Sequence, residues 1–96
     1  MEQDKNVYHY QDYKKYLNAV LSPVGEGRGM RSKLARAIGC QTAFISQVLK
    51  HDTHFSSEHA LLISDFLKHT ESESQYFMIL VQLGRAGTMA LQKFYK

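Results

Sequence analysis

The sequence contains one cysteine, one proline and no tryptophan, and it has no long apolar run. The single cysteine, Cys40, cannot form an internal disulfide, which excludes a small secreted scaffold held by disulfides. The longest apolar run, residues 76–81, is far shorter than the roughly 20 residues of a membrane-spanning helix, so no membrane partner is expected. The first ten residues lack the apolar core of a signal peptide, and we therefore expect a cytoplasmic protein.

The composition fits one small globular domain. The chain has 96 residues, and its 44% hydrophobic and 22% charged residues exclude wholesale disorder. We expect a polar N-terminal arm over residues 1–8 and a folded domain over residues 9–96. No glycine-rich phosphate loop, nucleophile motif or paired-carboxylate motif is present, so we expect no enzyme activity.

Apolar residues recur at helical spacing along the chain, and no segment alternates as a strand does. The first helix is predicted from Tyr10, with Tyr16 as the tyrosine expected to be exposed. The tyrosines near the N-terminus are interpreted as half-buried core, although a base-stacking platform is the alternative. The helix that follows Ser56 or Ser57 is predicted to bury the stripe Leu61, Leu62, Ile63, Phe66 and Leu67.

Capping residues mark where the later helices begin and end. A helix over residues 30–38 is expected to stop at Gly39, and the next is expected to start at Gln41 or Thr42. Thr70 and Glu73 form a predicted capping box, and Thr88 is the predicted cap of a short last helix. The predicted fold class is all-α, a compact bundle of five or six short helices.

The net charge of +3 is unevenly distributed. Residues 27–51 contain five basic residues and no acidic residue, whereas the rest of the chain contains seven basic and nine acidic residues. Such a block favours an anionic partner. The alternative is a solvated helix face that happens to lack acids.

Residues 30–50 have the spacing of a helix-turn-helix motif. The motif needs a small residue where its helices cross, a turn residue free to take positive φ, and an apolar residue that packs back into the angle. Ala35, Gly39 and Ile45 stand at the positions for these roles. The interior positions between them are apolar: Leu34, Ile38, Cys40 and Val48.

The segment RSKLARAIGCQTAFISQVLK resembles the helix-turn-helix of phage-repressor and Cro-type regulators, the lambda-repressor-like fold. The likeness runs from about residue 30 to residue 67. The early YQDYKKYL and the later ESQYFMILV extend the resemblance to the N-terminal region of a poorly characterised bacterial family of helix-turn-helix regulators. The resemblance implies a transcriptional regulator that binds double-stranded DNA in a sequence-specific manner, nucleoid-associated when bound. It leaves open that these 96 residues are the DNA-binding part of a longer protein.

The resemblance also implies which residues meet DNA. In the repressor pattern the second helix of the motif, here residues 42–50, enters the major groove. The implied base contacts are Gln41, Thr42, Ala43, Ser46, Gln47 and Lys50. The implied phosphate contacts are Arg28, Arg31, Ser32, Lys33 and Arg36. Phe44 either packs inward, which we favour, or faces the DNA.

No metal, cofactor or small-molecule ligand is expected. Cys40 and the histidines at 51, 54 and 59 do not have the spacing of a zinc-ligand set, and Cys40 is interpreted as a buried small hydrophobe.

Two partner hypotheses stay open. Residues 76–81 are apolar nearly all round, which suits a homodimer formed through residues 73–96, an absent domain or another protein. Alternatively, the last helix covers this segment. The alternative to DNA binding is a helix-turn-helix fold used as a protein-interaction module.

Overall fold

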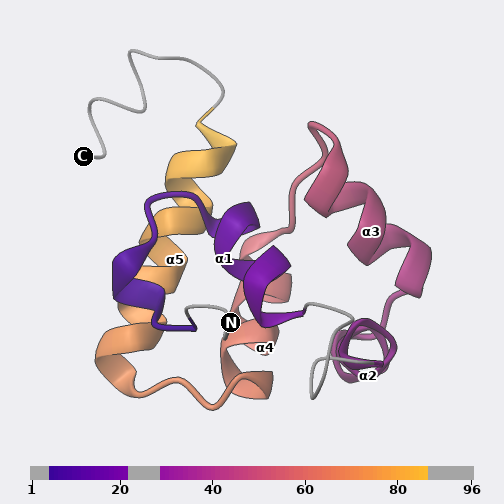
Figure 1. The fold of residues 1–96 in the computed structure, drawn as a ribbon, viewed down its shortest axis with the longest axis horizontal. Coiled ribbons are helices and arrows are strands. Elements are labelled where there is room, and N and C mark those ends of the chain that lie inside the picture. The colour runs from indigo at the N-terminus through magenta and orange to yellow at the C-terminus, as the bar shows by residue number, and fades with distance from the viewer. Residues whose placement is uncertain (1–4, 22–28, 87–96) are drawn as a thin grey trace.

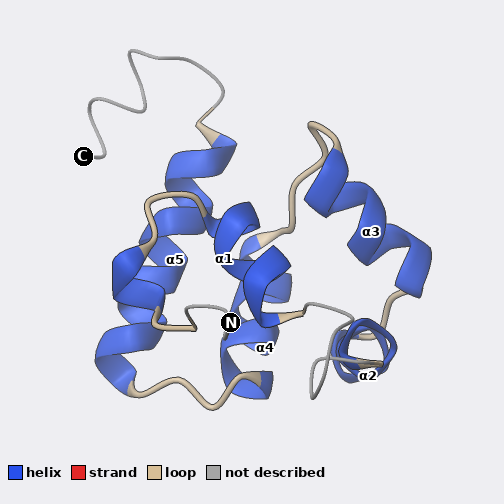
Figure 2. Cartoon of the chain, viewed as in Figure 1, coloured by secondary structure: helices blue, strands red, loops and turns tan. Residues whose placement is uncertain are grey.

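The computed structural model describes residues 5–21 and 29–86, and every regular element in these ranges is helical (Figure 2). The elements are η1 (Val7–His9), α1 (Tyr13–Val20), α2 (Met30–Ile38), α3 (Thr42–Lys50), α4 (Ser57–Phe66) and α5 (Glu71–Arg85). The predicted all-α class is confirmed. The short helix predicted after Thr88 lies outside the described residues.

Local chemistry sets most helix boundaries. Gly39 ends α2 in the left-handed region with φ of 73°, as expected for a residue without Cβ. The hydroxyl of Ser56 accepts a hydrogen bond from the backbone N–H of His59 at 3.0 Å, which caps α4. Thr70 and Glu73 form the predicted capping box at the start of α5, with bonds of 3.2 and 2.8 Å.

The N-terminal segment differs from the prediction. Val7 is only 1% exposed, so it belongs to the core and does not fit the expected polar arm. Helix α1 starts at Tyr13, where the Asp12 carboxylate accepts from the N–H of Lys14, three residues later than the apolar spacing from Tyr10 indicated.

The prediction that Tyr16 is exposed is wrong, because its side chain is 3% exposed. Helix α1 packs against both α3 and α5, so it is buried on more than the single stripe that its sequence shows. The Tyr16 hydroxyl bonds to Nε2 of His69 at 2.8 Å, and its ring meets Phe77 edge-on. Tyr16 therefore belongs to the core and is paired with the half-buried His69, a contact that periodicity did not indicate.

Helix α4 presents a different face from the one predicted. Leu61 and Leu62 are 51% and 42% exposed, whereas Ala60, Ile63 and Ser64 are buried. Three consecutive apolar residues span about 200° of a helix, so they cannot all share one face. The small side chains of Ala60 and Ser64 instead lie where α4 packs against its neighbours, which are α5 and α2.

The helices are arranged so that α2 and α3 occupy the opposite side of the molecule from α5 (Figure 1). Helix α1 lies between them and packs on α3 and α5, while α4 contacts both α5 and α2. Figure 1 views α2 nearly end-on and α3 from the side, so the two helix axes cross steeply. The body formed by α1, α4 and α5 thus supports α2 and α3 from one side.

Candidate nucleic-acid interface

The connection between α2 and α3 is short and internally hydrogen-bonded. It consists of residues 39–41. The N–H of Cys40 bonds to the carbonyl of Ala35 at 2.9 Å, and the N–H of Gly39 bonds to the carbonyl of Arg36 at 3.4 Å. With Gly39 in the left-handed region, these are the two bonds of a Schellman motif, which reverses the chain direction tightly.

All but one of the apolar residues expected inside the angle between α2 and α3 are buried. Leu34, Ala35, Ile38, Ile45 and Val48 are all buried. Cys40 is half-buried beside them, and burial raises the pKa of its thiol. A thiol in this setting stays protonated and acts as a small apolar side chain.

Phe44 is half-buried and packs inward. Its ring centroid lies 5.8 Å from that of Phe55 and 5.6 Å from that of His59. The phenylalanine therefore anchors the first turn of α3 to the segment around α4, which agrees with the favoured alternative.

The residues expected to contact bases lie along the outer side of α3. Five of them are exposed: Gln41, Thr42, Ala43, Gln47 and Lys50. Ser46, the sixth, is half-buried and accepts a hydrogen bond from Arg31. The outer face of α3 therefore carries amide, hydroxyl, methyl and ammonium groups, which are the groups that read base edges in a major groove.

The residues expected to contact phosphates lie in and before α2. Ser32, Lys33 and Arg36 are exposed, and Arg28 lies outside the described residues. The acidic residues of the described chain all lie before residue 22 or after residue 51, so the surface of α2 and α3 has no acidic side chain of its own. This surface, the exposed residues of α2 and α3, is called the basic face below.

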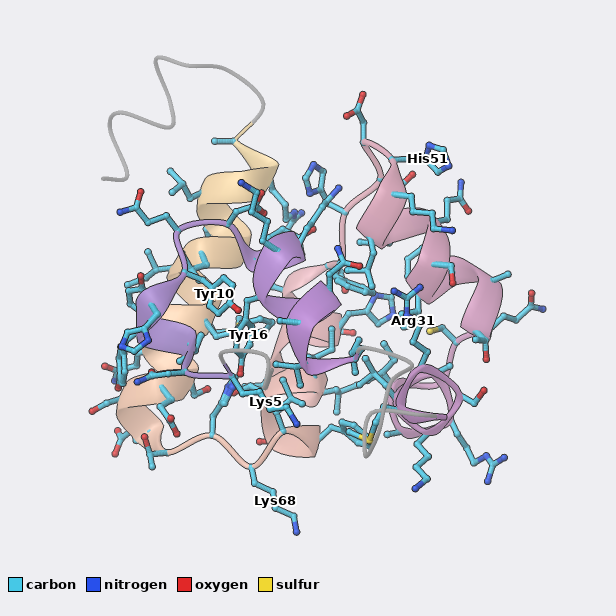
Figure 3. All side chains as sticks on the ribbon, in the orientation of Figure 1. Lys5, Tyr10, Tyr16, Arg31, His51 and Lys68 are labelled. Carbon is cyan, nitrogen blue, oxygen red and sulfur yellow. The ribbon has the colours of Figure 1, made fainter. Side chains whose placement is uncertain are left out.

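Arg31 is not freely exposed, in contrast to the other described residues expected to contact phosphates. Its side chain is half-buried and points into the space between α1, α2 and α3 (Figure 3). Nη1 donates to Ser46 Oγ and Nη2 donates to Asn18 Oδ1, each at 3.2 Å. Nε is enclosed and bonds to no residue in the described part of the chain. Each Nη nitrogen keeps a second N–H, so the guanidinium still has donors to offer a phosphate.

Sequence reasoning missed two residues of α1 that contact this region. Lys14 donates through Nζ to the backbone carbonyls of His51 and Thr53, the latter at 2.9 Å. Asn18 holds the Arg31 guanidinium, as described above. Because Lys14 and the carbonyls that it binds are nearly 40 residues apart, no spacing in the sequence indicates this contact.

A polar groove of about 730 Å³ lies at the N-terminal end of α1, and Lys14 is one of its lining residues. The N-terminal end of α1, the loop after α3 and the C-terminal end of α5 form its walls, and Tyr13 and His54 share a hydrogen bond of 2.8 Å there. Burial raises the pKa of Tyr13 to about 12 and lowers the pKa of His54, so both are uncharged at neutral pH. The groove presents acids and bases together and has no single charge sign.

The described residues contain no group of three or more His, Cys, Asp or Glu side chains placed to hold a metal ion. None of the helices in residues 5–21 and 29–86 has the length and apolarity needed to cross a membrane.

Comparison of the chain with protein-family models, with curated proteins and with solved structures finds no match. The likeness to phage-repressor regulators therefore stays a prediction, carried by the residues of α2 and α3.

Proposed function

We propose that this protein binds double-stranded DNA in a sequence-specific manner, with α2 and α3 acting as a helix-turn-helix and α3 in the major groove. The observation that supports this most is the basic face, where the outward side chains of α3 and Lys33 and Arg36 of α2 are exposed and neither helix carries an acidic residue. An acid-free surface of this kind suits the phosphate backbone, and the α3 side chains suit base edges.

In this proposal α2 binds phosphates and α3 reads bases. Lys33 and Arg36 bind phosphates and fix the register of the protein on the duplex, with Ser32 and the N-terminal turn of α2 beside them. Gln47 and Lys50 read bases toward the C-terminal end of α3, and Thr42 and Ala43 read them toward its N-terminal end. Regulation of transcription would follow from occupancy of a particular site.

We extend the proposal to a homodimer, since helix-turn-helix proteins commonly bind paired half-sites. Of the predicted dimer region, residues 73–96, the structure describes residues 73–86. Ile79 lies in the middle of α5 and is 54% exposed, so this helix offers an apolar outer position to a second copy.

Replacing Gln47 by alanine tests base reading. We expect the variant to lose discrimination at one or two base pairs of each half-site, at a cost of about 1–3 kcal/mol, because glutamine pairs bidentately with adenine. The measurement is selection of bound sequences from a random duplex pool, compared between wild type and variant. A palindromic sequence in the wild-type pool is the expected signature of the homodimer.

The matched control is Gln11→Ala, since Gln11 is an exposed glutamine that lies outside α2, α3 and the proposed dimer region. This variant is expected to select the wild-type sequence. A Gln47→Ala variant that selects the same sequence with the same discrimination would show that α3 does not read bases through this residue.

A further inference from the structure

One edge of α1 is bonded to the surroundings of α3. Lys14 and Asn18 are one helical turn apart and therefore lie on the same face of α1. Each makes side-chain hydrogen bonds toward the recognition helix or a residue that holds it. This pair is called the polar edge of α1 below.

Lys14 closes the C-terminal end of α3. His51 is the C-terminal cap residue of α3, and its carbonyl and that of Thr53 both accept from the Lys14 ammonium. Carbonyls at a helix C-terminus carry partial negative charge, which a lysine ammonium stabilises. The bond to Thr53 is partly buried, so water competes less for it than at a free surface, whereas the bond to His51 is exposed. Lys14 therefore ties the segment that directly follows α3 to α1.

Asn18 ties the middle of α3 to α1 through Arg31. The Asn18 Nδ2 group donates to the Lys14 carbonyl at 2.9 Å, which leaves Oδ1 facing the Arg31 guanidinium. Arg31 in turn donates to Ser46 on α3. Since a guanidinium only donates and a backbone carbonyl only accepts, this orientation of the amide satisfies both partners.

We propose that Lys14 and Asn18 are positioning residues that set the orientation of α3 and thereby its base selectivity, without contacting DNA. This inference rests on the proposed function. Bidentate pairing with base edges requires the reading side chains to be held within about 0.5 Å of the productive geometry. Polar bonds at the middle and at the end of α3 supply that restraint from the rigid body of the domain.

Replacing Lys14 by methionine tests the proposal, because methionine keeps an unbranched chain but removes all three N–H donors. We expect discrimination between the selected duplex and a scrambled duplex to fall at least about tenfold, because the variant loses both charge-assisted hydrogen bonds of Lys14. The loss is expected to be larger at base pairs read by Gln47 and Lys50 than at those read by Thr42 and Ala43, since the released end of α3 is the C-terminal one.

The salt dependence of binding separates positioning from direct contact. If Lys14 bound a phosphate, its removal would lower the slope of log K against log salt by about 0.9. We expect the slope of the Lys14→Met variant to equal that of wild type. A reduced slope with unchanged discrimination would overturn the proposal and make Lys14 a phosphate ligand.

Two control variants are available on the same helix. Lys15→Met removes an exposed lysine at the adjacent position and is expected to keep wild-type discrimination. Lys14→Arg keeps a cation with N–H donors and is expected to restore most of the discrimination. If Lys15→Met loses as much discrimination as Lys14→Met, general charge explains the effect and the positioning role is wrong.

Amide hydrogen exchange provides a readout that needs no DNA. In Lys14→Met we expect amides 48–51 to exchange about tenfold faster, with α5 amides unchanged, because one local restraint is removed. Equal acceleration in all helices would show global destabilisation and would overturn the local role. If the protein bound no DNA, the proposed function would fail, while this measurement would still report whether Lys14 restrains α3.

Discussion

Replacing Lys33 and Arg36 together by alanine is expected to weaken binding to duplex DNA about 30-fold at about 0.15 M salt. Both side chains are exposed on α2, and no acidic residue lies between positions 29 and 51 to offset them. Each lost phosphate contact removes about 0.9 from the slope of log K against log salt. Two lost contacts account for the expected loss of affinity of about 30-fold, and this loss becomes larger as the salt concentration falls. Fluorescence anisotropy with a labelled duplex measures both quantities.

Single substitutions give this prediction a matched control. Lys33 and Lys68 are both exposed lysines, but Lys68 lies between α4 and α5 and points away from α2 and α3 (Figure 3). Lys33→Ala is expected to lower the salt slope by about 0.9, and Lys68→Ala is expected to leave it unchanged. Equal losses from the two variants would mean that net charge, rather than the basic face, governs binding.

Replacing Phe77 by alanine is expected to lower the free energy of unfolding by about 3–5 kcal/mol. The Phe77 side chain is fully buried in α5, and its ring packs edge-on against Tyr16 at 5.9 Å and His69 at 5.5 Å. Its removal leaves a cavity beside two rings that are held in place by their own hydrogen bond. Because the free energy of unfolding of a small domain is only about 5–15 kcal/mol, this substitution removes a large part of it. Urea denaturation followed by circular dichroism measures the change.

Ile79→Ala is the matched control, two residues further along the same helix. Ile79 is 54% exposed, so its truncation in the monomer is expected to change the free energy of unfolding by less than about 0.5 kcal/mol. A small effect from Phe77→Ala would contradict the packing of α1 on α5. A large effect from Ile79→Ala that grows with protein concentration would show that a second copy covers this face.

Local signals in the sequence predicted much of the fold. The bounds of α2, the stop at Gly39 and the capping box at Thr70 and Glu73 follow from the conformational freedom of glycine and from side-chain bonds to free N–H groups. These effects act within four residues, so the sequence alone contains them. The start of α3 was predicted at Gln41 or Thr42, and in the structure Gln41 is the cap residue without a side-chain cap bond.

Long-range packing decided what the sequence did not predict. Tyr16 is buried because α1 has neighbours on two sides, and Leu61 is exposed because α4 turns its small residues inward. Periodicity identifies a helix, but the number of neighbours that cover it is a property of the whole fold.

The same distinction between local signals and long-range contacts applies to the residues of the candidate site. The outward residues of α3 follow from the inward positions of Ile45 and Val48, so a helical wheel predicts them. The position of Arg31 does not follow, since its guanidinium meets Asn18 and Ser46 from two other helices. Long polar side chains reach several ångströms beyond their own helix. The spacing of residues in the sequence therefore does not predict which groups their charged ends contact.

A salt titration of the wild-type protein on duplex DNA tests the central claim most directly. With about four phosphate contacts per protomer, log K against log salt is expected to fall with a slope of roughly −3 to −4. Binding must also be tighter for the selected sequence than for a scrambled duplex of the same length. The absence of any salt-dependent binding at low salt would contradict the account, and α2 and α3 would then be better explained as a surface for another protein.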